Sequence, residues 1–128
     1  MIHGIGIDLV HITRMQNNIE RYGDRFVKRI LSRVELDDYN GTSEPAYFLA
    51  KHFAAKEAMV KALGTGFRNG LTFKNISINR NQFGQPRIMC NGRASEIMNS
   101  YGIQCSHLTI TDEKDYACAC VVLETVNT

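Results

Sequence analysis

The chain has 128 residues, of which 44% are hydrophobic and 22% charged, and its net charge is +2. These values lie close to globular averages and exclude a disordered or fibrous chain, and the length predicts a single domain over residues 1–128. The small net charge gives no indication of a nucleic-acid partner. No apolar run reaches the roughly 18 residues of a membrane span and no leader pattern follows Met1, so we expect a cytoplasmic protein without a membrane partner.

Residues 2–10 alternate in the manner of a β-strand. Asp8 shares one face of this strand with Gly4 and Gly6. Two glycines beside a carboxylate leave the backbone open to close approach by a ligand or another chain. The opposite face is apolar and carries Ile5, Ile7 and Leu9.

Helix signals follow the first strand. Thr13 and Gln16 fit a capping box that opens a helix, which Gly23 closes. Asp24 is expected to cap the next helix, within residues 25–32. These signals predict two short helices in succession.

A second group of signals predicts a short helix and then a long one. Ser32 and Glu35 repeat the capping-box pattern. Residues 39–45 form a loop, and Pro45 suits the first turn of a helix that runs to Leu63. Gly64 is placed to end that helix.

The second half of the chain reads mainly as strands. Residues 73–81 and 86–92 predict a pair of strands, residues 93–101 a helix, and residues 107–113 and 116–124 a final hairpin. Cys118 and Cys120 share one face of the last strand and are expected to be core thiols rather than metal ligands. The element order predicts an α+β fold, a single domain with helices packed on a largely antiparallel sheet.

The helix over residues 45–63 carries charges on its apolar stripe. At 100° per residue, Glu57 falls near the middle of this stripe and Lys61 also falls within it. Lys51, His52 and Lys56 fall on the remaining side, where solvated residues are expected. A Glu57–Lys61 pair stabilises a helix by only about 0.2–0.5 kcal/mol, whereas burying each charge costs several kcal/mol. Two explanations remain open: a site for a metal and an anion, or a wet helix edge.

Asp8 is the candidate for a second carboxylate at such a site. Two carboxylates, Lys61 and the glycine-containing turn of Gly64, Thr65 and Gly66 are the parts expected around a magnesium-bound diphosphate. Magnesium takes one or two protein carboxylates and fills its other positions with water and phosphate oxygens. Each of these signals is weak when taken alone.

The segment from Arg14 to Arg33 is locally basic. It contains six basic residues and two acidic ones. An ordinary solvated helix face accounts for this excess, and so does a docking surface for an acidic partner.

Four stretches resemble one known family. "GIDLV", "FAAKEAMVKALGTG", "GQP" at residues 84–86 and "HLTITDEKDYACACVVLE" are similar to the holo-[acyl-carrier-protein] synthases, bacterial 4'-phosphopantetheinyl transferases of fatty-acid synthesis. The resemblance implies the 4'-phosphopantetheinyl transferase fold. It also implies transfer of 4'-phosphopantetheine from coenzyme A to a serine of apo acyl carrier protein, with release of adenosine 3',5'-bisphosphate.

The resemblance also assigns roles to residues. It implies that Asp8 and Glu57 bind magnesium and that Lys61 contacts phosphate, and Gly64, Thr65 and Gly66 are expected to line the coenzyme A site with Lys61. Asp8, Glu57 and a metal-bound water all remain open as the base that receives the serine proton. The resemblance also implies a homotrimer with the active site at the subunit interface. The residues expected to dock the acidic carrier protein are Arg14, Arg21, Arg25, Phe26 and Arg29.

One motif departs from the family. Many members have Ser-x-Ser-His on the penultimate strand, where this chain has Thr109, Ile110, Thr111 and Asp112. The hydroxyls persist, but an aspartate stands in place of the histidine and would repel phosphate unless it faces away. His107 lies on the other parity of the strand and is no direct substitute.

Three other functions are compatible with parts of the sequence. A magnesium-dependent phosphohydrolase would use the same carboxylates and Lys61 but leaves the basic segment unexplained. An RNA-binding module would need aromatic residues at alternate sheet positions, where this chain has mainly Ile, Val, Thr and Cys. An inactive scaffold of the same fold is disfavoured by the joint presence of Asp8, Glu57 and Lys61.

Overall fold

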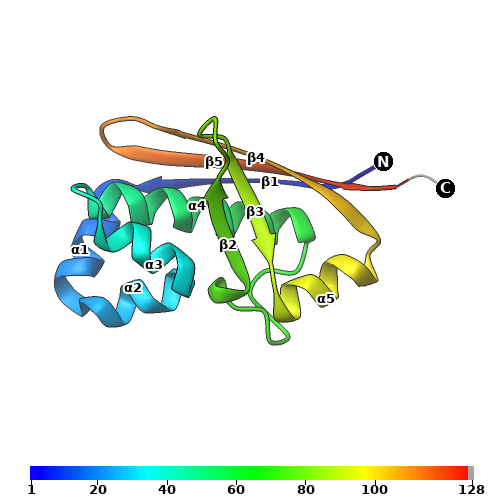
Figure 1. Ribbon diagram of the computed structural model, residues 1–128, viewed down its shortest axis with the longest axis horizontal. Coiled ribbons are helices and arrows are strands. Elements are labelled where there is room, and N and C mark those ends of the chain that lie inside the picture. Colours follow the sequence, from blue (N-terminus) through cyan, green and yellow to red (C-terminus); the bar gives the residue numbers. More distant parts are fainter. Residues whose placement is uncertain (127–128) are drawn as a thin grey trace.

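The computed structural model describes residues 1–126, which form an α+β fold with two antiparallel sheets (Figure 1). The larger sheet has the order β1-β5-β4, so β1 is an edge strand. The smaller sheet is the hairpin of β2 and β3. The predicted fold class is confirmed. The strands are β1 (Ile2–His11), β2 (Ile76–Arg80), β3 (Pro86–Cys90), β4 (Ile103–Asp112) and β5 (Tyr116–Thr125).

The helices lie on one side of the three-stranded sheet, and α4 packs directly against β1 and β5 (Figure 1). None of the helices within residues 1–126 has the length and apolar character needed to cross a membrane. The helices are α1 (Ile12–Tyr22), α2 (Asp24–Ile30), α3 (Arg33–Asn40), α4 (Pro45–Leu63) and α5 (Gly92–Ser100), with a 3-10 turn η1 (Phe73–Asn75) before β2.

Several predicted helix ends are confirmed. The Ser32 side chain and the Glu35 side chain form a reciprocal capping box at the start of α3. Pro45 is the first residue of α4, and Gly64 ends this helix in the left-handed conformation with φ of 83°. Local side-chain chemistry therefore determines where α3 begins and where α4 begins and ends.

Two predicted caps are wrong. Helix α1 begins at Ile12, and its N-cap is His11, whose Nδ1 accepts a hydrogen bond from the Thr13 backbone N–H. Because His11 is still paired with β5 as the last residue of β1, the chain turns directly from strand into helix one residue before Thr13. Asp24 is the first helical residue of α2 rather than its cap, which is Gly23.

Gly4 and Gly6 of β1 allow the backbone of α4 to approach the strand closely. A Cβ atom at Gly4 would overlap the carbonyl of Ala62, and one at Gly6 would overlap the carbonyl of Ala58. The prediction that a ligand or another chain approaches here is wrong, because the helix of the same chain fills the space. This close packing brings the C-terminal half of α4 beside Asp8.

The face of the three-stranded sheet that points away from α4 is uncovered. Ile5, Ile7 and Leu9 are 61%, 60% and 62% exposed on this face. Cys118 and Cys120 pair with Leu9 and Ile7 across the ladder, so their predicted shared face is confirmed. Their predicted core position is wrong, because the core lies on the opposite face, where Ala117, Ala119 and Val121 are buried.

Candidate functional site

Lys61 and Asp8 meet where the last turn of α4 lies beside β1. The Lys61 Nζ atom donates a hydrogen bond to Asp8 Oδ1 at 3.0 Å and another to the Ile7 carbonyl at 2.9 Å. The lysine side chain is half exposed, whereas the aspartate side chain is largely buried. Lys61 is therefore anchored to β1 while its ammonium group still faces solvent and can reach a ligand.

The Asp8 carboxylate has one oxygen without a protein partner. Oδ2 is buried, and within residues 1–126 it is the one buried side-chain oxygen or nitrogen that lacks a hydrogen bond. Leaving such an oxygen unpaired is costly, and the Asp8 carboxylate is close enough to a second carboxylate, that of Glu57, for the charge of Asp8 to act on it. An arrangement of this kind is typical of a cation site.

The second carboxylate belongs to Glu57, which is half-buried on α4. Burial, followed by the nearby Asp8 carboxylate, raises the pKa of Glu57, and Lys61 and Arg14 oppose this rise. Two acidic groups that disfavour each other's charge are stabilised by a divalent cation between them. The structure thus brings together Asp8, Glu57 and Lys61, the three residues that were predicted from separate parts of the sequence.

Arg14 of α1 also lies near this centre. Its guanidinium carbon is 5.3 Å from the centroid of the Phe53 ring, and its charge acts on the Glu57 carboxyl. Cation–π contact with Phe53 holds the side chain against α4. A residue expected only to dock a partner is therefore adjacent to the predicted metal ligands.

The turn after α4 uses its backbone amides to cap the helix. The N–H groups of Gly64, Thr65 and Gly66 all point to the Val60 carbonyl, and the Thr65 hydroxyl donates to the Gly66 carbonyl at 2.9 Å. A helix C-terminus also carries partial negative charge, which disfavours phosphate. In this arrangement Lys61, rather than the turn amides, is the group available to an anion.

The basic segment forms one surface over α1 and α2. Arg14, Arg21, Arg25 and Arg29 are exposed and Phe26 is half-buried. A surface hollow of about 510 Å³ lies among Asn18, Tyr22, Arg25, Phe26 and Arg29. The predicted docking residues thus lie on neighbouring helices, and three of them line one hollow.

Glu35, Lys56 and His52 form a buried polar network that no sequence pattern predicted. Lys56 is 0% exposed and Glu35 is 1% exposed, and His52 is also buried. The prediction that His52 and Lys56 lie on a solvated side of α4 is wrong. The physical reason is that α4 is covered by β1 and β5 on one side and by the other helices and η1 elsewhere, so it has no solvated face at these positions.

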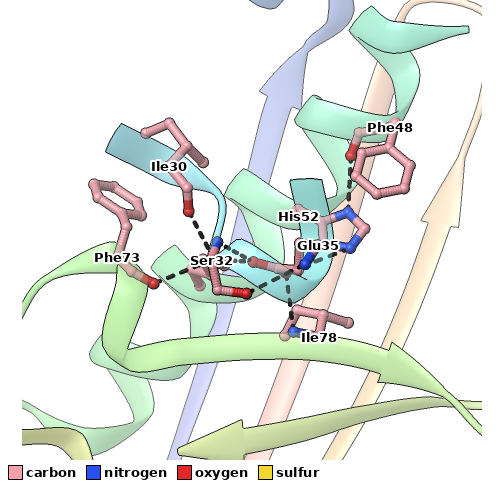
Figure 2. A network of polar contacts seen from close by, with 8 residues as sticks. Ile30, Ser32, Glu35, Phe48, His52, Phe73 and Ile78 are labelled. Carbon is pink, nitrogen blue, oxygen red and sulfur yellow. Dashed lines mark hydrogen bonds and ion pairs between the residues drawn. The ribbon is translucent and has the colours of Figure 1, made fainter. Parts of the chain in front are cut away.

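The Glu35 carboxylate is the centre of this network (Figure 2). Its Oε1 accepts hydrogen bonds from the Lys56 ammonium at 2.6 Å and from the Ser32 N–H at 2.8 Å. Its Oε2 accepts from the Ile78 N–H at 2.9 Å and lies 3.5 Å from His52 Nε2. The capping-box pattern identified Glu35 as a local cap, but its contacts with α4 and β2 carry no signal in the local sequence.

The buried histidine makes stability dependent on pH. Burial lowers the pKa of His52 below its ordinary value of 6.5, against the opposing effect of the Glu35 carboxylate. As the pH falls below 6.5, the unfolded chain takes up this proton before the folded chain does. We expect the free energy of unfolding to decrease with a slope of up to about 1.4 kcal/mol per pH unit, and His52→Gln to remove this part of the slope.

Urea unfolding of the original chain and of His52→Gln, between about pH 5 and 7.5, measures how the free energy of unfolding depends on pH. His107→Gln, a change at an exposed histidine, is the matched control and keeps the slope that belongs to His52. Equal slopes in the original chain and in His52→Gln would contradict the assignment.

The motif of residues 109–112 on β4, which differs from that of the family, has side chains on both faces of the strand. Thr109 and Thr111 pair with Cys120 and Cys118 on the uncovered face, while the exposed Asp112 pairs with Ala117 and has the opposite parity. His107 Nε2 lies 2.6 Å from Glu124 Oε1. His107 is thus engaged on β5, in keeping with the expectation that it does not stand in for the family histidine.

A further hollow of about 530 Å³ lies between β3 and β4. It is lined by residues 85–89 and 106–109, including Arg87 and His107. It shares no residue with the Asp8–Glu57 centre. The sequence analysis placed no site residue in it.

Comparison with known proteins identifies the family. A sequence model described as the 4'-phosphopantetheinyl transferase superfamily matches residues 4–121, which is most of the chain. The chain belongs to this superfamily.

Relatives place the chain within one branch of the superfamily. The holo-[acyl-carrier-protein] synthase of Photorhabdus laumondii is 45% identical over 96% of this chain and 98% of its own length. The crystal structure of that enzyme from Neisseria meningitidis is 38% identical and has a TM-score of 0.93, with 98% of this chain and all of that chain covered.

A third match is solved with its ligand. The Helicobacter pylori holo-[acyl-carrier-protein] synthase, in complex with coenzyme A, is 32% identical and has a TM-score of 0.82, with 94% of this chain and 99% of that chain covered. The predicted resemblance is confirmed. The chain is an enzyme of the holo-[acyl-carrier-protein] synthase type, a phosphopantetheinyl transferase.

Proposed function

We propose that this protein transfers 4'-phosphopantetheine from coenzyme A to a serine of apo acyl carrier protein, with magnesium as cofactor, in fatty-acid biosynthesis. Adenosine 3',5'-bisphosphate is the second product. The observation that carries the proposal is the meeting of Asp8, Glu57 and Lys61 beside one unpaired buried oxygen, in a chain of this family. The cytoplasmic location remains a prediction.

The residues present fit magnesium. Asp8 Oδ2 is buried without a hydrogen-bond partner, and Glu57 offers a carboxylate whose charge is disfavoured in the absence of a cation. Magnesium is usually held by one or two carboxylates, with water and substrate phosphate oxygens in the other positions. Asp8 and Glu57 would hold the ion. When bound, it would neutralise charge on the diphosphate of coenzyme A.

Lys61 is the proposed phosphate contact. Its Nζ atom is fixed by Asp8 and Ile7 and remains half exposed, so it can donate its third hydrogen to a phosphate oxygen. The neighbouring turn of Gly64, Thr65 and Gly66 would line the coenzyme A site beside Lys61, while its backbone amides stay bound to the Val60 carbonyl and leave the phosphate contact to Lys61. A fixed ammonium group at this point stabilises the negative charge that develops on the leaving phosphate.

The reaction forms one bond and breaks one. The serine oxygen bonds to the β-phosphorus of coenzyme A, and the bond from that phosphorus to the bridging oxygen breaks. The electron pair stays with the adenosine 3',5'-bisphosphate that departs. The serine proton must pass to a base, and Asp8 and Glu57 are this chain's candidates for that group.

The basic surface over α1 and α2 is proposed to dock the acidic carrier protein through Arg14, Arg21, Arg25, Phe26 and Arg29. We expect Arg25→Glu, at the hollow of α2, to raise the KM for the carrier about tenfold at low salt and to leave kcat nearly unchanged. Lys28→Glu, an exposed charge reversal on the same helix but outside that hollow, is the matched control. Steady-state kinetics at low and high ionic strength measure the effect, and equal KM values for the two variants would contradict this docking surface.

The uncovered sheet face supports a homotrimer with its active site at the subunit interface. Ile5, Ile7 and Leu9 form an exposed apolar row on the edge strand that also carries Asp8. We expect Ile7→Lys to yield monomers and to reduce turnover at least tenfold, because a buried lysine at the interface would lack a partner. Sedimentation equilibrium measures the assembly, with Val34→Lys, at another exposed apolar residue, as the control. A trimeric Ile7→Lys protein would contradict the assigned interface.

Intact mass spectrometry tests the proposed reaction. A verified apo acyl carrier protein is incubated with the enzyme and coenzyme A, in parallel with magnesium and with a chelator, and a carrier with the acceptor serine changed to alanine is the control. The proposal predicts a gain of one phosphopantetheine that requires magnesium and the serine. Release of nucleotide from coenzyme A without any gain on the carrier would favour a phosphohydrolase instead.

A further inference from the structure

The buried network around Lys56 joins the two parts of the molecule that the proposed reaction must hold together. Lys56 lies on α4 directly before Glu57. Successive residues on a helix point about 100° apart, so the two side chains leave α4 in different directions. Glu57 is near Asp8, whereas Lys56 extends toward α2, α3 and η1.

All three hydrogens of the Lys56 ammonium are used. Nζ donates to the Ile30 carbonyl at 2.6 Å, to Glu35 Oε1 at 2.6 Å and to the Phe73 carbonyl at 3.2 Å. Ile30 is the last residue of α2. Its carbonyl lies at the C-terminal end of the helix, where carbonyl groups lack helical partners and attract a cation. Lys56 therefore bonds the end of the helix that carries Arg25, Phe26 and Arg29 directly to the helix that carries Glu57.

Glu35 fixes the position of the Lys56 ammonium group. It accepts from Lys56, from the N–H of Ser32 and from the N–H of Ile78 on β2, so its two oxygens have fixed positions (Figure 2). Apolar residues of similar size commonly stabilise a core as well as a buried ion pair does. Stability alone therefore does not explain why Lys56 and Glu35 are charged. The fixed directions of their hydrogen bonds offer an explanation.

We propose that Lys56, oriented by Glu35, is a positioning residue that sets the end of α2 and its docking surface relative to Glu57. This inference rests on the proposed function, because it assigns a role toward the carrier-protein surface and the carboxylate of that reaction. Misplacement of reacting groups by about 1 Å costs up to about a hundredfold in rate. The Lys56 ammonium is fully engaged by Glu35 and two backbone carbonyls, and it contacts neither metal nor substrate.

The test is a double variant, Glu35→Gln with Lys56→Met, which removes both charges together and keeps both shapes. Removing one partner alone would leave the other charged and buried, so the single Lys56→Met variant is expected to unfold readily. The matched control is Lys51→Met, on the same helix, whose side chain forms no ion pair or hydrogen bond within the described residues.

We expect the folded double variant to keep its KM for coenzyme A within about twofold and to lose at least tenfold in kcat with the carrier protein. If Lys56 and Glu35 only stabilise the fold, the folded double variant should have the same kcat as the original chain. Unchanged kcat in the folded double variant overturns the proposal. If the double variant does not fold, Lys56→Arg takes its place, because it keeps a positive charge beside Glu35 but presents a longer, planar group in place of the ammonium. The same pattern of kcat and KM is expected.

A crystal structure of the variant gives a second result that does not depend on activity. The proposal predicts that the C-terminal end of α2 and the Glu57 carboxylate shift relative to each other, and superimposable positions overturn it. If the original chain fails to modify any carrier, the proposed function fails, and the crystal structure still decides whether Lys56 sets this geometry.

Discussion

Glu57→Gln is expected to abolish phosphopantetheine transfer while the protein stays folded. An amide is a much poorer magnesium ligand than a carboxylate, so turnover should fall by at least about a hundredfold. The fold should be unaffected, because the Glu57 carboxylate forms no hydrogen bond or ion pair within residues 1–126. Burial and Asp8 already raise the pKa of Glu57, so removing its charge relieves an unfavourable interaction.

Initial rates at saturating coenzyme A and carrier, together with thermal unfolding midpoints, measure this prediction. Glu44→Gln is a suitable control, because Glu44 is an exposed carboxylate at the start of the same helix and makes no side-chain cap there. Full turnover by the Glu57→Gln protein would show that Glu57 is not a metal ligand. Loss of turnover together with loss of the fold would instead place Glu57 among the structural residues.

Gly6→Ala is expected to destabilise the fold strongly, because among the glycines the added Cβ at Gly6 would make the shortest contact. The added Cβ would overlap the Ala58 carbonyl, and this atom belongs to the backbone of α4 and cannot rotate away. The helix must therefore move off β1. We expect a loss of more than about 3 kcal/mol in the free energy of unfolding, at the upper end of overpacking effects.

The same substitution at Gly41 provides the control. Gly41 has φ of −94°, and a Cβ there would make only ordinary contacts with the Asp38 and Asp37 carbonyls. Gly41→Ala should be neutral or slightly stabilising, by up to about 1 kcal/mol, because it reduces the freedom of the unfolded chain. Denaturant unfolding compares the two variants, and similar stabilities would contradict the close approach of α4 to β1.

Local patterns predicted the elements and much of the candidate site. The alternation of residues 2–10, the Ser32–Glu35 capping box and the Pro45 to Gly64 span each depend on neighbours in sequence, and the structure has all three. The closeness of Asp8 and Lys61 fits one of the two explanations that the charged stripe left open, a site with partners from another element rather than a wet helix edge.

The missed features depend on contacts between distant segments. Lys56 was placed in solvent because the helical wheel assumed a single buried face for α4, whereas its ammonium partners are the carbonyls of Ile30 and Phe73 and a carboxylate on another helix. Backbone carbonyls are present at every residue, so no sequence pattern marks these two as partners. Likewise, Gly4 and Gly6 indicated a close approach, but only the packing of α4 identified what approaches.

We propose that Asp8 and Glu57 jointly hold the divalent ion at the reaction centre. The most direct test of this proposal is anomalous diffraction from crystals grown with coenzyme A and Mn²⁺ in place of magnesium. We expect one strong anomalous peak between the two carboxylates, next to the diphosphate and Lys61, and no such peak in Glu57→Gln crystals. A bound coenzyme A with its Mn²⁺ ion away from Asp8 and Glu57 would contradict the proposal.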